Sequence, residues 1–108
     1  MSDQFMEDRK KEVTENKILL YIKGTKDQPQ CGFSAQTLQI FSQVGKPFTT
    51  VDVLTNPEIR RRMQEFSNWP TFPQVFIGGE FVGGCDIVAE MHEKGELEPL
   101  VKKAFGEA

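Results

Sequence analysis

The feature that most constrains the fold is a run of five apolar residues, Ile18 to Ile22, which is bounded by Lys17 and Lys23. An uninterrupted apolar run of this length is typical of a strand that is buried on both faces. A chain of 108 residues is long enough to bury one modest core around such a strand. We therefore expect a single domain over residues 1–108.

Helical and strand-like patterns alternate along the rest of the chain. Apolar spacing and helix-starting residues predict helices within 3–16, 34–44, 57–66, 85–94 and 97–105. Shorter apolar runs predict strands at 48–52, 74–77 and 80–83. This order, in which strands and helices alternate first and a strand pair follows, predicts an α/β fold with a small mixed sheet covered by helices.

Two local signals define boundaries in this pattern. Asn56 precedes Pro57, and this pair predicts a helix start with Asn as the cap and Pro at the first helical position. Gly78 and Gly79 separate two apolar runs, which predicts a hairpin because a tight turn needs residues with positive φ. We assign Arg61 and Arg62 of the basic run after Ile59 to the solvated surface.

Composition excludes several classes of protein. The net charge of −3 argues against a nucleic-acid partner, which would call for a basic patch. No apolar run approaches the ~20 residues of a membrane helix, so we expect no membrane association. The polar N-terminus lacks the pattern of a secretory signal or a transit segment. A cytoplasmic protein is the simplest interpretation, and a processed organellar protein with an added Met is the alternative.

Cys31 is the candidate for thiol chemistry, because it lies where a polar loop becomes a predicted helix. The unpaired N–H groups and the dipole of a helix N-terminus favour thiolate over thiol. Lys23 at the end of the preceding strand can add a positive charge. Such settings lower a cysteine pKa from ~8.5 into the range of ~3.5–7.5, and the thiolate is the form that attacks disulfides and binds metal.

Ser34 occupies the place where a dithiol oxidoreductase would carry its second cysteine. A hydroxyl cannot resolve a mixed disulfide. The residues around Cys31 thus argue against a protein-disulfide reductase that works through two neighbouring thiols.

Four segments together resemble the monothiol glutaredoxin family. They are Lys23–Thr25 (Lys-Gly-Thr), Cys31–Ser34 (Cys-Gly-Phe-Ser), Trp69–Gln74 (Trp-Pro-Thr-Phe-Pro-Gln) and Gly78–Asp86 (Gly-Gly-Glu-Phe-Val-Gly-Gly-Cys-Asp). Their order and spacing agree with the family over roughly residues 17–105. The resemblance implies a thioredoxin fold, with a four-stranded mixed sheet flanked by helices and an extra N-terminal helix.

The resemblance also implies a glutathione site, and each part of it has a physical reason. Lys23 and Arg60 would bind the glycine carboxylate as cations. A cis Phe72–Pro73 bond would expose the backbone of Phe72 to the tripeptide. Cys85 and Asp86 open a helix, whose free N–H groups suit the γ-glutamyl carboxylate, and the Asp86 side chain suits the ammonium group. Gly83 and Gly84 would let the backbone approach the ligand.

The family's solution to ligating a cluster is a homodimer. A 2Fe–2S cluster usually takes four thiolates, and the resemblance implies that two chains each give Cys31 and two glutathione molecules give the other two. We therefore expect a cofactor set of glutathione and a bridging 2Fe–2S cluster, with transfer to iron–sulfur apoproteins. Cys85 is open: a backbone contact to glutathione is favoured over a disulfide with Cys31 or a substitute ligand.

Two alternatives use the same residues. One is a glutathione-dependent one-cysteine oxidoreductase that removes glutathione from protein thiols. The stretch between Lys23 and Cys31 is longer than in dithiol glutaredoxins and argues against it, so we expect at most weak enzymatic activity. The other is a regulatory subunit, in which a BolA-type protein replaces one protomer and contacts Trp69–Pro70 and the rim of Cys31.

Overall fold

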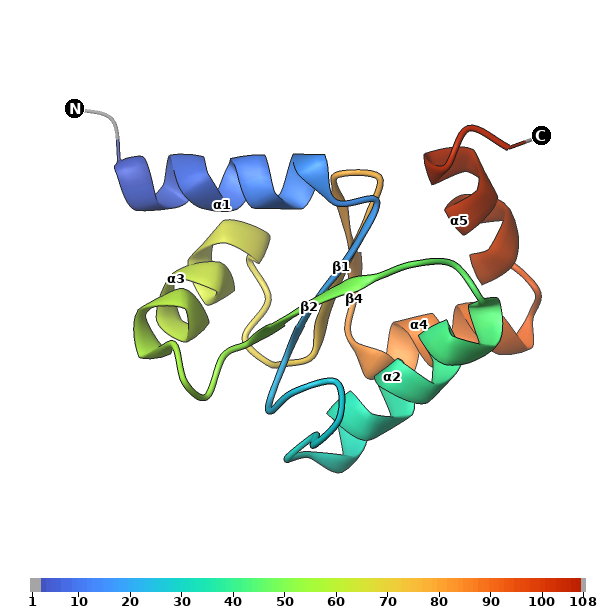
Figure 1. Ribbon diagram of the computed structural model, residues 1–108, viewed down its shortest axis with the longest axis horizontal. Coiled ribbons are helices and arrows are strands. Elements are labelled where there is room, and N and C mark those ends of the chain that lie inside the picture. The colour runs from blue at the N-terminus through green and yellow to red at the C-terminus, as the bar shows by residue number, and fades with distance from the viewer. Residues whose placement is uncertain (1–2, 108) are drawn as a thin grey trace.

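The computed structural model describes residues 3–107, and Met1, Ser2 and Ala108 lie outside the described residues. Within that range the elements follow the predicted order (Figure 1). They are α1 Gln4–Glu15, β1 Ile18–Ile22, α2 Gly32–Val44, β2 Thr49–Asp52, α3 Pro57–Ser67, β3 Gln74–Ile77, β4 Glu80–Gly83, α4 Cys85–Glu93 and α5 Leu97–Ala104.

The four strands form one mixed sheet in the order β2-β1-β3-β4. β1 pairs in parallel with β2, and Leu19 lies opposite Thr49. β1 pairs antiparallel with β3, and Ile18 lies opposite Ile77. The turn at Gly78–Gly79 joins β3 to the antiparallel strand β4, as its sequence predicted. The thioredoxin fold expected from the sequence is confirmed.

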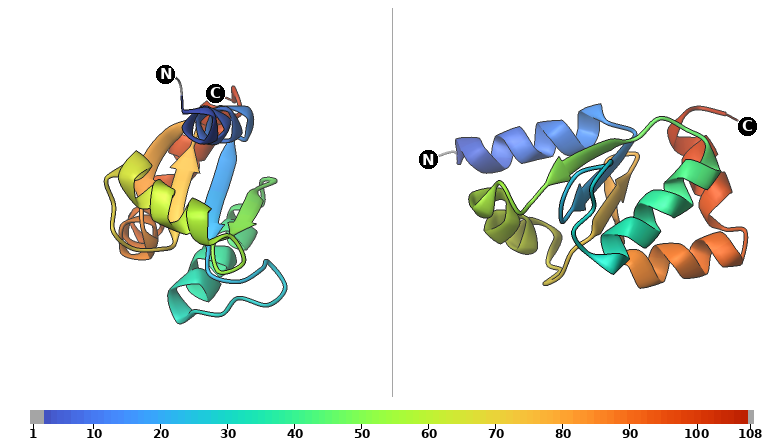
Figure 2. Two further views of the ribbon diagram at one scale, coloured as in Figure 1. Left: turned by 90° about the vertical axis from the view of Figure 1, so that its left-hand side faces the viewer. Right: turned by 60° about the horizontal axis from the view of Figure 1, so that its bottom comes forward.

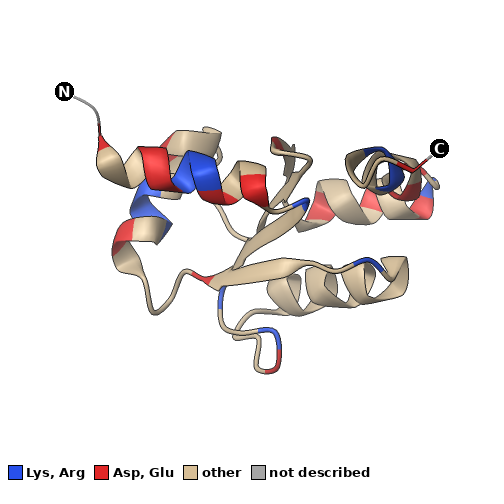
Figure 3. Cartoon of the chain, turned by 45° about the horizontal axis from the view of Figure 1, so that its top comes forward, with Lys and Arg blue, Asp and Glu red and all other residues tan. Residues whose placement is uncertain are grey.

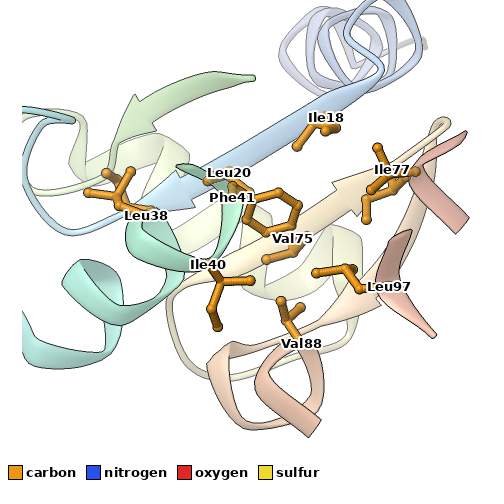
Figure 4. Close-up of a cluster of buried hydrophobic side chains, with 11 residues drawn as sticks. Ile18, Leu20, Leu38, Ile40, Phe41, Val75, Ile77, Val88 and Leu97 are labelled. Carbon is orange, nitrogen blue, oxygen red and sulfur yellow. The ribbon is translucent and has the colours of Figure 1, made fainter. Parts of the chain in front are cut away.

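Helices cover both faces of this sheet. Figure 1 and the right-hand view of Figure 2 show α1 and α3 on one side and α2, α4 and α5 on the other. Because side chains alternate along a strand, the apolar run of β1 divides between two cores. Ile18, Leu20 and Ile22 join the larger cluster around Phe41 (Figure 4). Leu19 and Tyr21 join the smaller cluster under α1 and α3, so all five residues are buried.

Polar contacts hold α1 against the rest of the molecule. The hydroxyl of Tyr21, which is buried in the sheet, donates to Oε1 of Glu12 at 2.6 Å. Two guanidinium groups contact the ring of Phe5: that of Arg9 lies 4.9 Å from the ring centroid and that of Arg62 lies 5.2 Å from it. Arg62 also forms an ion pair with Asp3. Arg62 lies at the surface as expected, but its side chain also joins α3 to α1, which the basic run did not indicate.

The start of α3 differs from the prediction in one detail. Asn56 is the N-cap residue and Pro57 takes the first helical turn, but the Asn56 side chain makes no capping hydrogen bond. Its Nδ2 instead donates to the carbonyl oxygen of Asp52 at 2.8 Å. The amide group is therefore used to tie the loop after β2 to the strand.

Charged side chains are unevenly distributed over the helices. Figure 3 shows charged residues on α1, α3, α4 and α5, those of α4 being acidic only, whereas α2 carries none. None of the helices within residues 3–107 is both long enough and apolar enough to cross a membrane.

Candidate functional site

Cys31 is the N-cap residue of α2, and its backbone is extended (φ −149°, ψ 138°). The helix follows at once with Gly32, two residues earlier than the apolar spacing predicted. Ser34 in the first turn is fully buried, and its Oγ accepts a hydrogen bond from the backbone N–H of Lys23 at 3.1 Å. Ser34 thus joins the end of β1 to the start of α2, which places Lys23 beside the thiol.

The first turn of α2 lowers the pKa of Cys31 below that of an ordinary thiol. The backbone N–H of Ser34 contributes most, and partial burial of the thiol opposes it. The N–H of Phe33, the positive charge of Lys23 and the hydroxyl of Ser34 add smaller effects in the lowering direction. The pKa of Cys31 is therefore shifted in the direction that its position at a helix start predicted.

A cavity of about 650 Å³ opens beside Cys31. It lies between the end of β1, the first turn of α2, the loop before β3 and the start of α4. Its lining includes six of the seven predicted site residues: Lys23, Cys31, Phe72, Pro73, Cys85 and Asp86. The seventh, Arg60, lies exposed on α3 and is not among the lining residues.

The loop before β3 forms one wall of the cavity. The Phe72–Pro73 peptide bond is cis, as the resemblance implied. Gln74 follows this bond and is fully buried, and its Nε2 donates to the carbonyl oxygens of Trp69 at 3.0 Å and Thr71 at 3.2 Å. Sequence reasoning gave Gln74 no role. A glutamine at the start of an otherwise apolar strand is the signal that could have found it, because a buried amide needs partners.

The start of α4 forms the opposite wall. Gly84 is the N-cap residue, and Cys85 and Asp86 open the first turn. A Cβ at Gly84 would lie 3.2 Å from Nε1 of Trp69, and one at Gly83 would lie 2.8 Å from the side chain of Ile87. Side chains of this protein itself therefore lie against the two glycines, whereas the resemblance implied an approach of their backbone to the ligand.

Apolar side chains surround the mouth of the cavity. Phe33 is 58% exposed and Ile87 is 37% exposed, and both line the cavity with Cys31.

Within residues 3–107, no three His, Cys, Asp or Glu side chains gather into a group that could hold a metal ion. Cys31 is a free thiol of intermediate exposure, whereas Cys85 is buried.

Comparison with known proteins gives the same assignment. The glutaredoxin family model matches residues 18–82, which is more than half of the chain. The chain is 52% identical to glutaredoxin 4 of Escherichia coli K12 over 93 residues, which cover 86% of this chain and 81% of that protein. It is equally identical, at 52% over 93 residues, to an uncharacterised monothiol glutaredoxin of Synechocystis, covering 86% of this chain and 87% of the relative.

A solved structure with the same fold is the complex of buckwheat glutaredoxin with glutathione. It superposes with a TM-score of 0.84 at 26% sequence identity and covers 97% of this chain and 94% of its own. The family model, the two relatives and a helix-start cysteine followed by Gly-Phe-Ser agree with one another. The chain belongs to the monothiol glutaredoxins.

Proposed function

We propose that this protein binds glutathione in the cavity beside Cys31 and carries a 2Fe–2S cluster, which it transfers to iron–sulfur apoproteins. The observation that supports this most is the position of Cys31. Its thiol has a lowered pKa and lies at the mouth of a cavity that six of the seven predicted site residues line. A thiolate at an accessible edge can bind iron and release it again.

The walls of the cavity suit an extended tripeptide with two charged ends. Lys23 at one side offers a cation for the glycine carboxylate, and Arg60 on α3 is proposed to reach the same group. The backbone of Phe72 can pair with the peptide as a strand edge does. Asp86 and the free N–H groups of the first turn of α4 suit the γ-glutamyl end. The buckwheat relative binds glutathione within the same fold.

The cluster is proposed as cargo that two chains share. Four thiolates are the usual ligand set of a 2Fe–2S cluster. Each chain offers the thiol of Cys31, which is of intermediate exposure, and each bound glutathione offers one more. The apolar side chains of Phe33 and Ile87 around Cys31 provide a surface on which a second copy, or a BolA-type protein in its place, can pack. Half of the ligands are diffusible, so the cluster can be passed on.

The lowered pKa of Cys31 also supports a second candidate function. A thiolate at this position can attack the glutathione sulfur of a protein–glutathione mixed disulfide, so that the protein thiol leaves. A free glutathione thiolate then attacks the glutathione sulfur of the disulfide at Cys31, which releases glutathione disulfide and restores the Cys31 thiolate. This one-cysteine exchange requires no second thiol in the chain, in keeping with Ser34 at the position of a resolving cysteine.

Anaerobic reconstitution with iron, sulfide and glutathione tests the proposed function. The product is analysed by visible absorption on a sizing column, for the unchanged chain and for Cys31→Ser, with and without glutathione. Cys85→Ser is the matched control, because it removes the buried thiol and leaves the more accessible thiol of Cys31. We expect a coloured dimer that disappears with Cys31→Ser or without glutathione and persists with Cys85→Ser. A colourless monomer under every condition would refute the cluster carrier and favour the one-cysteine exchange.

A further inference from the structure

Asp52 is the last residue of β2 and lies opposite Ile22 at the end of β1. Its side chain is half-buried, and one carboxylate oxygen, Oδ1, accepts two backbone hydrogen bonds. The N–H of Gly24 donates at 3.0 Å and the N–H of Leu54 at 2.8 Å. These two groups belong to different segments, the turn that follows β1 and the loop that leads to α3.

The first of these segments carries Lys23. The backbone N–H of Lys23 is held by Ser34, and its carbonyl oxygen accepts from the N–H of Gln30 at 2.9 Å. The next N–H, that of Gly24, is the one that Asp52 binds. Asp52 therefore supplies the side-chain contact that fixes the turn directly after Lys23 to the neighbouring strand.

The second segment leads to Arg60. The carbonyl oxygen of Asp52 accepts a hydrogen bond from Nδ2 of Asn56, and the carbonyl oxygen of Asn56 accepts the first-turn hydrogen bond from the N–H of Arg60 at 3.0 Å. With the contact from Oδ1 to the N–H of Leu54, Asp52 holds this loop at two points. One residue thus joins the chain segments that present both cations.

We propose that Asp52 is a positioning residue that sets the spacing of Lys23 and Arg60, and thereby determines how tightly the protein binds the glycine carboxylate of glutathione. The inference depends on the proposed glutathione site. Asp52 acts through the two backbone segments and not by contact with the ligand. Hydrogen bonds that a carboxylate accepts are roughly twice as strong as those of a neutral acceptor, which suits a residue that must hold two loops.

The charge of Asp52 makes the proposal sharply testable. Removing a negative charge near an anion site strengthens anion binding if the charge alone matters. A positioning role predicts the opposite, because the two cations lose their common anchor. The direction of the change in affinity therefore separates the two explanations.

The experiment compares glutathione with γ-glutamylcysteine, which lacks the glycine and its carboxylate. Affinities of the reduced ligands are measured by calorimetric titration for the unchanged chain, Asp52→Ala and Asp52→Asn. We expect Asp52→Ala to weaken glutathione binding by about tenfold and to leave γ-glutamylcysteine binding within about twofold. Asp52→Asn keeps a neutral acceptor in the same place, so we expect an intermediate loss of about threefold.

Asp27→Ala is the matched control, because it removes the same charge from the exposed loop beside the site. We expect it to preserve the preference for glutathione over γ-glutamylcysteine. Circular dichroism melting shows whether each variant is folded. If Asp52→Ala does not fold, the test rests on Asp52→Asn alone. An Asp52→Asn variant that prefers glutathione over γ-glutamylcysteine as strongly as the unchanged chain does would then refute the positioning role.

Failure of the inference can be distinguished from failure of the proposed site. If the unchanged chain binds neither ligand, or binds both equally, the proposed contact of Lys23 and Arg60 with the glycine carboxylate is wrong. If the unchanged chain prefers glutathione but Asp52→Ala weakens both ligands equally, or strengthens glutathione binding, the positioning role of Asp52 is wrong and the site stands.

Discussion

At the scale of single residues, the pKa of Cys31 depends mainly on groups of the three residues that follow it in the sequence. Backbone N–H groups of Phe33 and Ser34 lower its pKa, and the hydroxyl of Ser34 adds to them. Lys23 is the one contributor from another element, and it is a full charge. The effect of Lys23 on the pKa of Cys31 is therefore one that a substitution can remove without changing the backbone of α2.

Lys23→Ala is expected to raise the pKa of Cys31 towards its ordinary value, because the nearby positive charge that favours the thiolate is lost. The rate of alkylation of Cys31 measured against pH reports this change. The midpoint of the profile should move to higher pH, and the rates of the two proteins should converge in strongly alkaline solution. Lys26→Ala is the control, since the ammonium group of Lys26 lies over the ring of Phe48. An unchanged midpoint in Lys23→Ala would contradict the assigned effect of its charge.

Gln74→Met is expected to lower both the free energy of unfolding and the affinity for glutathione. The variant keeps a buried side chain of similar size but leaves two carbonyl oxygens, those of Trp69 and Thr71, without their donor. An unsatisfied buried polar group costs about 1–3 kcal/mol. Urea unfolding and glutathione titration measure the two effects. Gln39→Met, at an exposed position of α2, should change neither, and equal effects in the two variants would refute the role of Gln74.

The residue-scale predictions succeeded where the partner is close in sequence. A cysteine at a loop–helix boundary is visible in the sequence, because the N–H groups that act on it are those of the next three residues. The contacts of Asp52 join positions 24, 52 and 54, and nothing in the composition of β2 marks its carboxylate as a bridge. Asn56 is the N-cap residue of α3 as predicted, but the sequence did not show that its amide binds the carbonyl oxygen of Asp52 and not the helix.

At the scale of elements, α1 is held by one buried hydroxyl as well as by apolar packing. Tyr21 belongs to the central strand, and its hydroxyl is the group that donates to Glu12 on α1. Burial and the neighbouring Glu12 carboxylate raise the pKa of Tyr21 well above its ordinary value, so the phenol stays protonated as a donor.

Tyr21→Phe is expected to lower the free energy of unfolding by about 1.5–3 kcal/mol, the usual contribution of a hydrogen bond to a charged group. Chemical denaturation of the variant measures the loss. Thr14→Val, which also removes a hydroxyl, is the control, because Thr14 donates only to carbonyl oxygens of its own helix. If combining Tyr21→Phe with Glu12→Gln doubled the loss, the two side chains would not be coupled and the assigned hydrogen bond would be wrong.

The element boundaries were largely predictable from local signals. The apolar run gave β1 with its bounds, and the two glycines gave the turn between β3 and β4. α2 begins two residues before the predicted start, because Gly32 and Phe33 carry no apolar periodicity and Phe33 is exposed. The tie between α1 and α3 through Arg62 was not predicted, since an arginine in a basic run gives no sign of a distant partner.

At the scale of the whole molecule, the sheet separates two cores, and the cavity lies where one end of the sheet meets α2 and α4. The Cα radius of gyration is 13.3 Å, which is close to the ~13 Å expected for a compact domain of about 100 residues. The alternation of helices and strands was sufficient to predict the fold class. The sequence order alone did not place the start of α4 against the loop before β3, and the resemblance was needed to bring Cys31 and Asp86 to one site.

A reconstituted dimer is expected to lose its colour when glutathione is removed, because glutathione is proposed to give half of the thiolate ligands. Rapid exchange into buffer with and without glutathione, followed by visible absorption and sizing, measures the loss of the cluster and the return to monomers. Circular dichroism should show that the released chains stay folded. A colour that persists without glutathione in the unchanged chain but fades in Cys85→Ser would instead assign a ligand role to Cys85.

The burial of Cys85 within the first turn of α4 has a consequence for how motion in this protein can be followed. Only 5% of Cys85 is exposed although it lines the cavity, so a thiol reagent reaches it when the residues that cover it move. Its modification rate, measured after the faster reaction of Cys31, is therefore a kinetic record of local unfolding at a single helix end. The Cys85 thiol is thus a built-in probe of local opening at the wall of the cavity. A bound ligand that stabilises this wall should slow the modification of Cys85, and the more strongly it stabilises the wall, the slower the modification should be.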